Sequence, residues 1–566
     1  MKTNIYKLAS LLLMLMLSTS HLRAYDFMVD SLAYNVNSDG TSVTVTYAQQ
    51  YSPSNYSGLT TVSIPSSVTY EGITYSVTAI GESAFYYSYD LTNITLPNSI
   101  ISIGQYAFYF CYNLKEIIIP NSVISIGFDS FWNCKGLTSV TIGESVKSIG
   151  VAAFRNCTSL TQVILPNSVT YLGDGAFQNC SSLISITLPN SITAINDGTF
   201  TSCISLTDIN IPNSVTTIGH FSFMQCKSLK SVIIPESVTL IGERAFSGCA
   251  GMTSVTIGNS VTDIYKAAFY GCKSLTSVII PKSVTLIGIT TFNECSNLNS
   301  IIVEEENPKF DSRDNCNAII ETATNALIAG CNNSTIPNSV TSIAAWAFTY
   351  CRGLTGELTI PDSVTSIDRS AFAHCSGLTR VNLSNSLTTI GMDAFGECTG
   401  LEGELTIPNS VTSIGESAFY YCNGLTSLII PNSVTLIAAD AFMNCKGLAN
   451  IYNYINHPTD VELDSYTFYG VDKSNCTLHV IKGRLDEYSQ ADYWKDFLNI
   501  IDDLEGPVDA GDVNGDGRVN VSDVTTLINM ILGVVEKDEQ LADVNGDGKV
   551  NVSDVTALIN IILGVI

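Results

Sequence analysis

Basic residues are scarce in this chain of 566 residues, and charge of either sign is uncommon. Charged residues make up 14% of the sequence, with 26 Lys and Arg against 52 Asp and Glu, so the formal net charge is −26. An acidic chain without a basic stripe is a poor partner for nucleic acid or an anionic membrane. Acidic residues concentrated near its end instead favour a hard cation such as Ca²⁺.

Catalytic motifs and long apolar runs are also missing. The sequence has no G-x-S-x-G motif, and His220, His374, His457 and His479 lack the spacing of metal ligands. Beyond the N-terminus, no run approaches the roughly 18 apolar residues needed to span a membrane. We therefore expect neither an enzyme nor membrane insertion.

The N-terminus has the features of a secretory signal. Lys2 and Lys7 precede the apolar run Leu11–Leu17, and the polar stretch Ser18–Arg23 ends at Ala24. We expect residues 1–24 to be removed and the mature protein to be secreted or held non-covalently at a cell surface.

One 23-residue unit repeats through most of the chain, as in LTSVIIPKSVTLIGITTFNECSN at residues 275–297. Its Phe recurs every 23 residues from Phe85 to Phe292, and again from Phe348 to Phe442 at intervals of 23 or 24. Such a period predicts a solenoid, because one unit cannot bury its apolar face alone and copies must stack.

The pattern inside each unit predicts its local structure. Alternation at Val278 and Ile280 indicates a short inward-facing strand that Pro281 ends. The x-x-A/T-F-x-x-C segment that follows predicts a short helical turn with Phe292 and Cys295 facing inward. In two units a GEL sequence, Gly356–Leu358 and Gly403–Leu405, adds one residue and predicts a bulge.

This pattern resembles the BspA-like leucine-rich repeats of bacterial surface and secreted proteins, over roughly residues 25–500. The resemblance implies a leucine-rich repeat solenoid with one short parallel strand per coil, and adhesion to host or matrix proteins without fixing the ligand. We expect a hairpin cap at 25–58 around Ser38–Gly40, a solenoid at 59–448 with an irregular insert at 301–335, and a C-terminal cap at 449–501. That cap is expected to contain a short helix with Tyr493, Trp494 and Phe497, and an acidic linker at 502–510 follows.

Seventeen cysteines would ordinarily suggest disulfides in an exported protein, but their position argues against disulfides. Fourteen lie three residues after the repeat Phe, in one slot of successive coils, so we expect a ladder of buried thiols. Within the insert, Asn317–Glu321 and Ala326–Gly330 can pair as a hairpin that brings Cys316 and Cys331 together. These two form either a disulfide or an ordinary buried pair.

The last domain contains two copies of a calcium-loop motif, DVNGDGRVNVSD at Asp512–Asp523 and DVNGDGKVNVSD at Asp543–Asp554. Both fit the EF-hand pattern except for Asp at position twelve, and we expect two Ca²⁺ ions. The predicted ligands of the first loop are Asp512, Asn514, Asp516, the Arg518 carbonyl, Asn520 and Asp523. Those of the second loop are Asp543, Asn545, Asp547, the Lys549 carbonyl, Asn551 and Asp554.

A helix is expected after each loop, since apolar residues recur at helical spacing from Val524 to Leu532 and from Val555 to Leu563. The duplicated loop–helix, at residues 511–566, resembles the type I dockerin, a small all-α calcium-binding domain that binds cohesin modules in cellulosome-type assemblies. The resemblance implies that partner contacts fall on Val521, Ser522, Ile528 and Asn529 and on the identical set Val552, Ser553, Ile559 and Asn560. Either half could dock, or the two Ile side chains could instead pack inside or against the solenoid.

The solenoid offers a surface rather than an active site. One outward column of strand positions carries Ile118, Ile164, Ile233, Ile279, Ile302 and Ile429 among threonines. These residues either reflect strand propensity or form an apolar stripe for a protein or glycan.

Three functions follow from these features. The first is a secreted bacterial binding or adhesion protein whose dockerin attaches it to a cohesin-bearing scaffold or the cell surface. The second is a rigid spacer in a cellulosome-like assembly, and the third is an accessory component of polysaccharide degradation. The sequence does not identify the solenoid's ligand, the cohesin or the oligomeric state.

Overall fold

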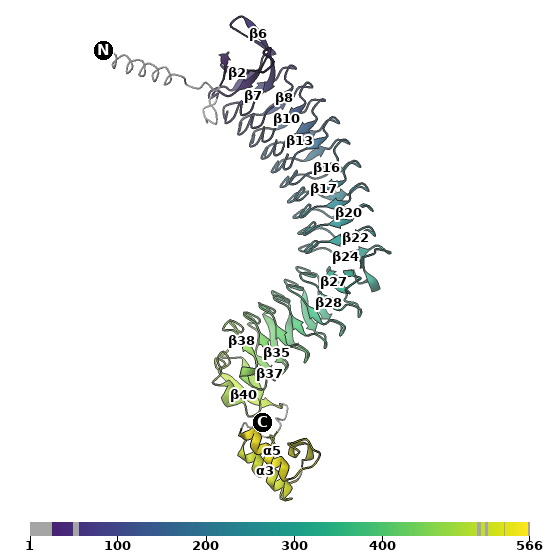
Figure 1. The fold of residues 1–566 in the computed structure, drawn as a ribbon, viewed down its shortest axis with the longest axis vertical. Coiled ribbons are helices and arrows are strands. Elements are labelled where there is room, and N and C mark those ends of the chain that lie inside the picture. Colours follow the sequence, from purple (N-terminus) through teal and green to yellow (C-terminus); the bar gives the residue numbers. More distant parts are fainter. Residues whose placement is uncertain (1–24, 49–55, 507–510, 516–518, 537, 564–566) are drawn as a thin grey trace, which may run out of the picture. The chain divides into compact units, whose positions relative to one another are not determined.

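The computed structural model describes residues 25–48, 56–506, 511–515, 519–536 and 538–563, so the expected signal segment 1–24 lies outside the described residues. Contacts divide the chain into two compact units, residues 1–298 with 303–309 and residues 299–302 with 310–566. Each unit contains a stack of coils (Figure 1). Within the described ranges, none of the helices is both long and apolar enough to cross a membrane.

Each coil of the first unit has three sides. In one coil, β11 (Ser139–Thr141) belongs to the first sheet, β12 (Ser148–Ile149) belongs to the second sheet, and residues 151–156 form the turn side. Strands pair in parallel with their counterparts one coil away, as Val140 does with Ile117. The predicted parallel solenoid is therefore confirmed, with a second short strand in each coil that the repeat pattern did not single out.

We call first sheet the row of strands β4 (Thr61–Ser63), β7 (Asn93–Thr95), β9 (Glu116–Ile118), β11, β13 (Gln162–Ile164), β15 (Ser185–Thr187), β18 (Ser231–Ile233), β20 (Ser254–Thr256) and β22 (Ser277–Ile280). Its hydrogen bonding is interrupted, because β4 to β15 form one six-stranded sheet, whereas β18 pairs with β20 and β22 with β24 (Ser300–Val303). We call second sheet the row β8 (Ser102–Ile103), β10 (Ser125–Ile126), β12, β14 (Tyr171–Leu172), β16 (Ala194–Ile195), β17 (Thr217–Ile218), β19 (Leu240–Ile241), β21 (Asp263–Ile264) and β23 (Leu286–Ile287), which is interrupted between β14 and β16.

The N-terminal cap is larger than expected. The predicted hairpin is confirmed as β2 (Leu32–Val36) paired antiparallel with β3 (Ser42–Thr46), and β1 (Phe27–Val29) pairs with β2. A second hairpin, β5 (Ser67–Tyr70) with β6 (Ile73–Ile80), lies beyond residue 58, and β6 joins β3 to β8. Its turn residues Glu71 and Gly72 both have positive φ, which suits a two-residue hairpin turn.

The turn side is not helical, so that prediction was wrong. In each coil the residues two before and two after the Phe have positive φ, as Asp129 (51°) and Asn133 (59°) do around Phe131. This left-handed backbone interrupts a helix and directs amides along the stack, where Phe131 N donates to Ala153 O (2.8 Å) and Asn133 N to Arg155 O (2.8 Å). Hydrogen bonds between coils thus replace those of a helix.

The core is a ladder of aligned side chains. Phe108, Phe131 and Phe154 are fully buried and stack with ring centroids 5.0 Å apart. The predicted thiol ladder is also confirmed, because the cysteines that follow the repeat Phe form no disulfide and, apart from the half-buried Cys351, are buried. The thiol of Cys351 lies 3.7 Å from the Gly330 carbonyl, and the other ladder thiols donate to the carbonyl of the Phe one coil earlier, as Cys134 does to Phe108 (3.1 Å). Burial raises the pKa of Cys203 to about 12, which keeps this thiol protonated.

The second unit repeats this plan. Its first sheet contains β29 (Gly356–Thr359), β31 (Leu378–Asn382), β33 (Glu402–Thr406), β35 (Gly424–Ile430), β37 (Asn450–Asn453), β39 (Thr477–Ile481) and β40 (Asn499–Leu504). Its second sheet contains β25 (Phe310–Asp311), β26 (Ile319–Glu321), β27 (Ala326–Ala329), β28 (Ser342–Ile343), β30 (Ser366–Ile367), β32 (Thr389–Ile390), β34 (Ser413–Ile414), β36 (Leu436–Ile437) and β38 (Glu462–Leu463). Strand β24 (Ser300–Val303) spans the division between the units. The register shifts after Gly356 and after Gly403 confirm the two predicted bulges.

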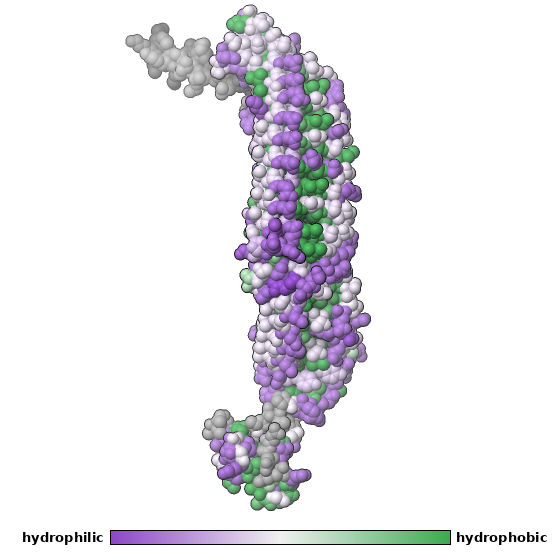
Figure 2. Space-filling view, turned by 90° about the vertical axis from the view of Figure 1, so that its right-hand side faces the viewer, coloured by the Kyte–Doolittle hydropathy of each residue, from purple (hydrophilic) through white to green (hydrophobic). Residues whose placement is uncertain are grey.

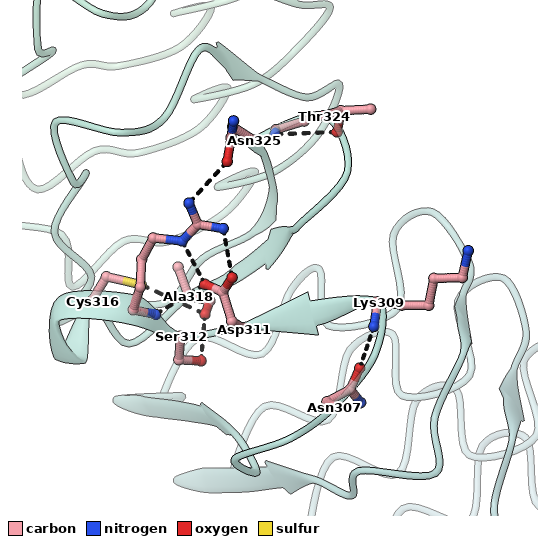
Figure 3. A network of polar contacts seen from close by, with 10 residues as sticks. Asn307, Lys309, Asp311, Ser312, Cys316, Ala318, Thr324 and Asn325 are labelled. Atoms are coloured by element: carbon pink, nitrogen blue, oxygen red, sulfur yellow. Dashed lines mark hydrogen bonds and ion pairs between the residues drawn. The ribbon is translucent and has the colours of Figure 1, made fainter.

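The insert forms the predicted hairpin but not a disulfide. Strands β26 and β27 pair antiparallel, while Cys316 and Cys331 are both free and buried. The Cys316 thiol points to the Ala318 carbonyl (3.7 Å), to which the Ser312 hydroxyl also donates (Figure 3). The Cys331 thiol donates to the Asn317 carbonyl at 3.2 Å. The buried-pair alternative therefore describes this structure, because each sulfur has its own backbone acceptor.

The C-terminal cap differs from the expectation in two ways. Its helix is α2 (Leu485–Tyr488), whereas Trp494 and Phe497 are buried in the turn that follows and Tyr493 is exposed. Strand β40 continues to Leu504 and pairs with β39, so residues 502–504 belong to the sheet rather than to a linker. The remaining helices are the 3₁₀ turns η1 (Arg313–Asn315) and η2 (Pro458–Asp460), and α3 (Val521–Ile531), α4 (Glu539–Ala542) and α5 (Val552–Ile562).

Candidate functional site

Two equivalent loop–helix segments form the candidate metal centre. Helix α3 starts after Asn520, whose side chain accepts from Ser522 N (2.9 Å), and Asp523 accepts in return from Asn520 N (2.8 Å). Helix α5 has the same reciprocal cap between Asn551 and Asp554. Such capping boxes satisfy amides that the first helical turn leaves without partners. Each helix is thereby fixed to the end of its own acidic loop.

The second loop curls its side-chain oxygens toward its own backbone. Asp547 N donates to Asp543 Oδ1 (3.0 Å) and Asn545 Oδ1 (2.9 Å), and Gly548 N donates to Asp543 Oδ2 (2.7 Å). Asp554 is fully buried and accepts from the amides of Asn545 (3.2 Å) and Asn551 (2.8 Å). The predicted ligand side chains of this loop therefore surround one short segment of backbone.

The first loop repeats the part of this arrangement that is described. Asp523 is fully buried and accepts from Asn514 N (3.1 Å) as well as Asn520 N, and Asn514 Nδ2 donates to Ser522 Oγ (2.8 Å). Asp512 is 4% exposed. The predicted ligands Asp516 and Arg518 lie outside the described residues.

The chemistry of the predicted ligand atoms fits a calcium ion. Carboxylate, amide and carbonyl oxygens at these intervals are the ligands that Ca²⁺ takes, and positive φ at Gly546 and Gly548 allows the loop to fold back. Among the described residues, no group of three or more His, Cys, Asp or Glu side chains is arranged so that it could hold a metal ion. The buried carboxylates face backbone amides instead, and a cation would compensate their charge.

The predicted partner residues occupy matching places on the two halves. Val521 and Val552 are each 70% exposed, and Ile528 and Ile559 are each 40% exposed. The alternative that these isoleucines pack inside or against the solenoid stays a prediction. Ser522 and Ser553 lie in the first turns of α3 and α5, where each hydroxyl accepts from an Asn side chain of the preceding loop. Asn529 and Asn560 are half-buried.

A small core holds the two helices together. Buried residues from α3, α4, α5 and the first loop form it: Val513, Leu527, Met530, Ala542 and Leu558. Leu532 and Leu563, expected on the apolar side of the helices, are instead about 70% exposed, because each lies at the C-cap just beyond its helix.

The outward isoleucine column lies on the first sheet. In the first unit Ile118, Ile164, Ile233 and Ile279 are all exposed, and apolar side chains form a stripe along the coils (Figure 2). A hollow of about 420 Å³ lies at Thr141, which holds the column position in the coil between those of Ile118 and Ile164. Gln162 and Glu144 are among the residues that line it. In the second unit Ile302 is exposed, whereas Ile429 is half-buried beside a separate hollow of about 320 Å³.

Sequence reasoning missed a group of aromatic side chains on the turn side of the first unit. It includes Tyr86, Tyr109 and Trp132, which occupy the slot directly after the repeat Phe in three successive coils. The available signal was the density of Tyr and Phe in residues 85–89 and 106–112, which stands out against the polar residues of later coils.

Comparisons with known proteins bear on both parts of the chain. A family described as "BspA type Leucine rich repeat region (6 copies)" matches residues 78–207, 193–319 and 326–449. One described as "Dockerin type I domain" matches residues 510–563. A search of curated proteins found no significant match.

Two solved structures are similar to this chain. A leucine-rich repeat protein from Bacteroides ovatus ATCC 8483 is 28% identical, with a TM-score of 0.51, and the match covers 81% of this chain and 100% of that one. A leucine rich cell surface protein from Faecalibacterium prausnitzii A2-165 is 29% identical, with a TM-score of 0.44 and coverage of 75% and 94%.

Proposed function

Because this chain belongs to the BspA-type leucine-rich repeat family and carries a type I dockerin domain, we propose that it is a secreted bacterial binding protein without catalytic activity. Its solenoid contacts a ligand outside the cell, and its dockerin attaches the chain to a cohesin module on a scaffold or cell surface. Both matched families are interaction modules, and the described structure adds no cluster of metal-ligating side chains to the solenoid.

The observation that carries the attachment role is the duplicated exposed surface of the last domain. The exposed fraction of Val521 equals that of Val552, and the exposed fraction of Ile528 equals that of Ile559. Leaving apolar side chains this exposed lowers the stability of an isolated helix pair only a little. Covering them with a partner contributes favourable free energy of binding, because apolar surface is removed from water. Two equal surfaces on opposite halves allow the same partner to dock in either of two orientations.

Calcium would organise these surfaces. Asp512, Asn514, Asp516, the Arg518 carbonyl, Asn520 and Asp523 would hold one ion, and the equivalent residues from Asp543 to Asp554 the other. When bound, each ion supplies the positive charge that compensates the buried acids. Asp523 and Asp554 belong both to the loops and to the helix caps, so ion binding and helix position are coupled.

Binding of the full chain to a panel of type I cohesin modules, measured by calorimetry with Ca²⁺ and with chelator, tests this proposal. Ile528→Arg or Ile559→Arg alone should leave binding nearly intact, because the other half remains. The double variant should lower the affinity at least a hundredfold. Glu536→Gln, which changes the charge by the same amount beyond α3, serves as the control. No binding to any cohesin, or equal binding without Ca²⁺, would contradict the proposal.

The outward isoleucine column supports a protein ligand for the solenoid. Four exposed isoleucines on one sheet face are more than isolated apolar residues, which are normal on a surface. Replacing Ile164 and Ile233 together by Ser should weaken capture of an extracellular matrix protein without changing stability. The spacer alternative predicts no capture by the wild-type solenoid at all. Hydrolysis of polysaccharide by the purified chain would favour the third role, in fibre degradation.

A further inference from the structure

The turn side of the first unit carries an aromatic surface that the repeat does not require. We name the aromatic ledge as Tyr86, Tyr89, Tyr109, Phe110, Tyr112 and Trp132. Its rings contact one another in a continuous chain, with Tyr86 and Tyr109 stacked at 4.8 Å and Trp132 edge-on to Tyr109 at 5.3 Å. All six side chains are only half-buried. The ledge therefore presents ring edges and hydroxyl groups to solvent from three successive coils.

Later coils of the same stack show what these slots hold when only packing matters. The slot of Tyr86, Tyr109 and Trp132 is filled by Gln178, Thr201, Met224 and Ser247 in four later coils of the unit. Those coils keep the same Phe ladder and the same intercoil hydrogen bonds, as in Phe177 N to Thr199 O (3.0 Å). The aromatic residues are thus not needed to build a coil.

A hollow of about 300 Å³ adjoins the end of the ledge. Arg155 links the two, because its guanidinium lies over the Trp132 ring at 4.8 Å and its side chain also lines the hollow. Gly175 and Gly198 line the hollow and lie two residues before the repeat Phe of their coils. In other coils this position carries a larger side chain, such as Asp129 or Phe221. Both glycines have the positive φ that this position adopts in every coil of this unit, and without a side chain they leave the floor of the hollow open.

Polar groups of both kinds surround this floor. Asp174 and Asp197 supply carboxylate acceptors, Arg155 supplies donors, and Gln178 supplies one acceptor and two donors. Asp197 is already held in place, since one of its oxygens accepts from His220 N at 2.7 Å. Phe221 and Met224 form an apolar wall. This mixture suits a ligand that is rich in hydroxyl groups and has apolar C–H faces.

From this arrangement we propose that the aromatic ledge and the adjoining hollow bind a neutral polysaccharide chain. Sugar hydroxyls both donate and accept, which matches the mixed lining, and the two carboxylates disfavour a polyanionic glycan. Apolar sugar faces pack against the rings, whose mutual contacts hold them rigid and so lower the entropy lost on binding. The site lies on the turn side and is independent of the isoleucine column and the dockerin.

The test is binding of the full chain to a panel of neutral polysaccharides (β-glucan, xylan, mannan and galactan) by affinity electrophoresis and calorimetry. At least one should bind and change the tryptophan fluorescence. Trp132→Ala and Tyr109→Ala should each lower the affinity tenfold or more, and Asp174→Ala with Gln178→Ala should do the same. Trp132→Phe should keep most of the affinity and lose most of the fluorescence change.

Tyr469→Ala, which removes an exposed tyrosine from the second unit, provides the matched control, and it should bind as wild type does. Denaturant midpoints near that of wild type exclude misfolding of the variants as the cause. Flat titrations with every neutral polysaccharide would overturn the proposal, and so would unchanged affinity in the ledge and hollow variants. Equal binding of a polyanionic glycan such as polygalacturonate would contradict the chemistry assigned to the two carboxylates.

Discussion

The coil stack and the C-terminal helix pair are stabilised in opposite ways. In the coil stack nearly every distinctive residue of the repeat faces inward, and the aligned Phe and Cys side chains are buried in coil after coil. In the helix pair the buried set is small, and Asp512, Asp523 and Asp554 are among its buried residues. One region gains its stability from apolar contact, whereas the other buries charge that needs compensation.

This difference separates stability from function. Inward residues of the stack determine the fold and leave the outer slots free to vary, as the exchange of Trp132 for Gln178 or Thr201 shows. In the helix pair the same residues serve both purposes, because Asp523 and Asp554 cap the helices and belong to the loops. A substitution in a coil can therefore change binding alone, but one in a loop changes binding and folding together.

The largest expected effect in the stack comes from breaking the aromatic ladder. Phe154→Ala removes a fully buried ring that stacks on Phe131 at 5.0 Å and Phe177 at 5.4 Å. It should lower the free energy of unfolding by about 3–5 kcal/mol, measured by denaturant titration. The helix pair should keep its calcium response. Ile164→Ala on the outer face is the control, and an equal loss there would refute the contrast between inner and outer slots.

A smaller effect is expected from the left-handed turn residues. Arg244 is exposed and has a φ of 53°, so its replacement tests the backbone rather than packing. Arg244→Val should cost about 1–2 kcal/mol, since a β-branched residue tolerates this conformation poorly. Arg244→Gly should be better tolerated than Arg244→Val. Equal stabilities of the two variants would show that the turn side does not constrain the backbone as described.

The thiol ladder should contribute less again. Cys157 is fully buried, and its thiol donates to the Phe131 carbonyl at 3.3 Å. Cys157→Ala should cost about 1 kcal/mol for the lost hydrogen bond, with a further cost for the cavity. Cys157→Ser, which keeps a donor, is the comparison. Rapid reaction of this thiol with a labelling reagent in the native protein would contradict its burial.

The smallest expected effect depends on pH. Burial raises the pKa of Asp129 to about 7, although nearby Arg155 lowers it. The folded state thus holds this proton more tightly than the unfolded state, and the resulting stability is lost as pH rises from about 4 toward 7. Asp129→Asn should therefore gain stability relative to wild type between pH 5 and pH 8. Parallel pH profiles of Asp129→Asn and wild type would contradict this.

Most of the fold could be predicted from the sequence because the inward-facing residues recur at the same positions of successive repeats. Phe, Cys and the Val of the first strand appear where the core has them, and the extra residues at Gly356 and Gly403 produce bulges. The turn side was misassigned as helical, since a short segment with Ala and Phe has helical composition but its backbone is set by hydrogen bonds between coils. Such contacts are not visible within one repeat.

The functional surfaces were less predictable for the same reason. Ligand spacing in the two loops is local, so the calcium residues are predicted from the sequence directly, and their role stays a prediction. The second hairpin at residues 67–80 and the position of Trp494 outside α2 depend on contacts between distant residues. The aromatic ledge is also assembled from three coils, and its equivalent residues, such as Tyr86, Tyr109 and Trp132, lie 23 positions apart in the chain.

Chelation of calcium from the full chain tests the contrast most directly. Hydrogen exchange, read separately for residues 59–500 and 511–566, should be measured with Ca²⁺ and with chelator. We expect protection of α3 and α5 to be lost on chelation, while the amides of the coil stack exchange as before. Asp512→Ala with Asp543→Ala should give the chelated pattern even when Ca²⁺ is present. Helices that stay protected without Ca²⁺, or a coil stack that loses protection with them, would contradict the account.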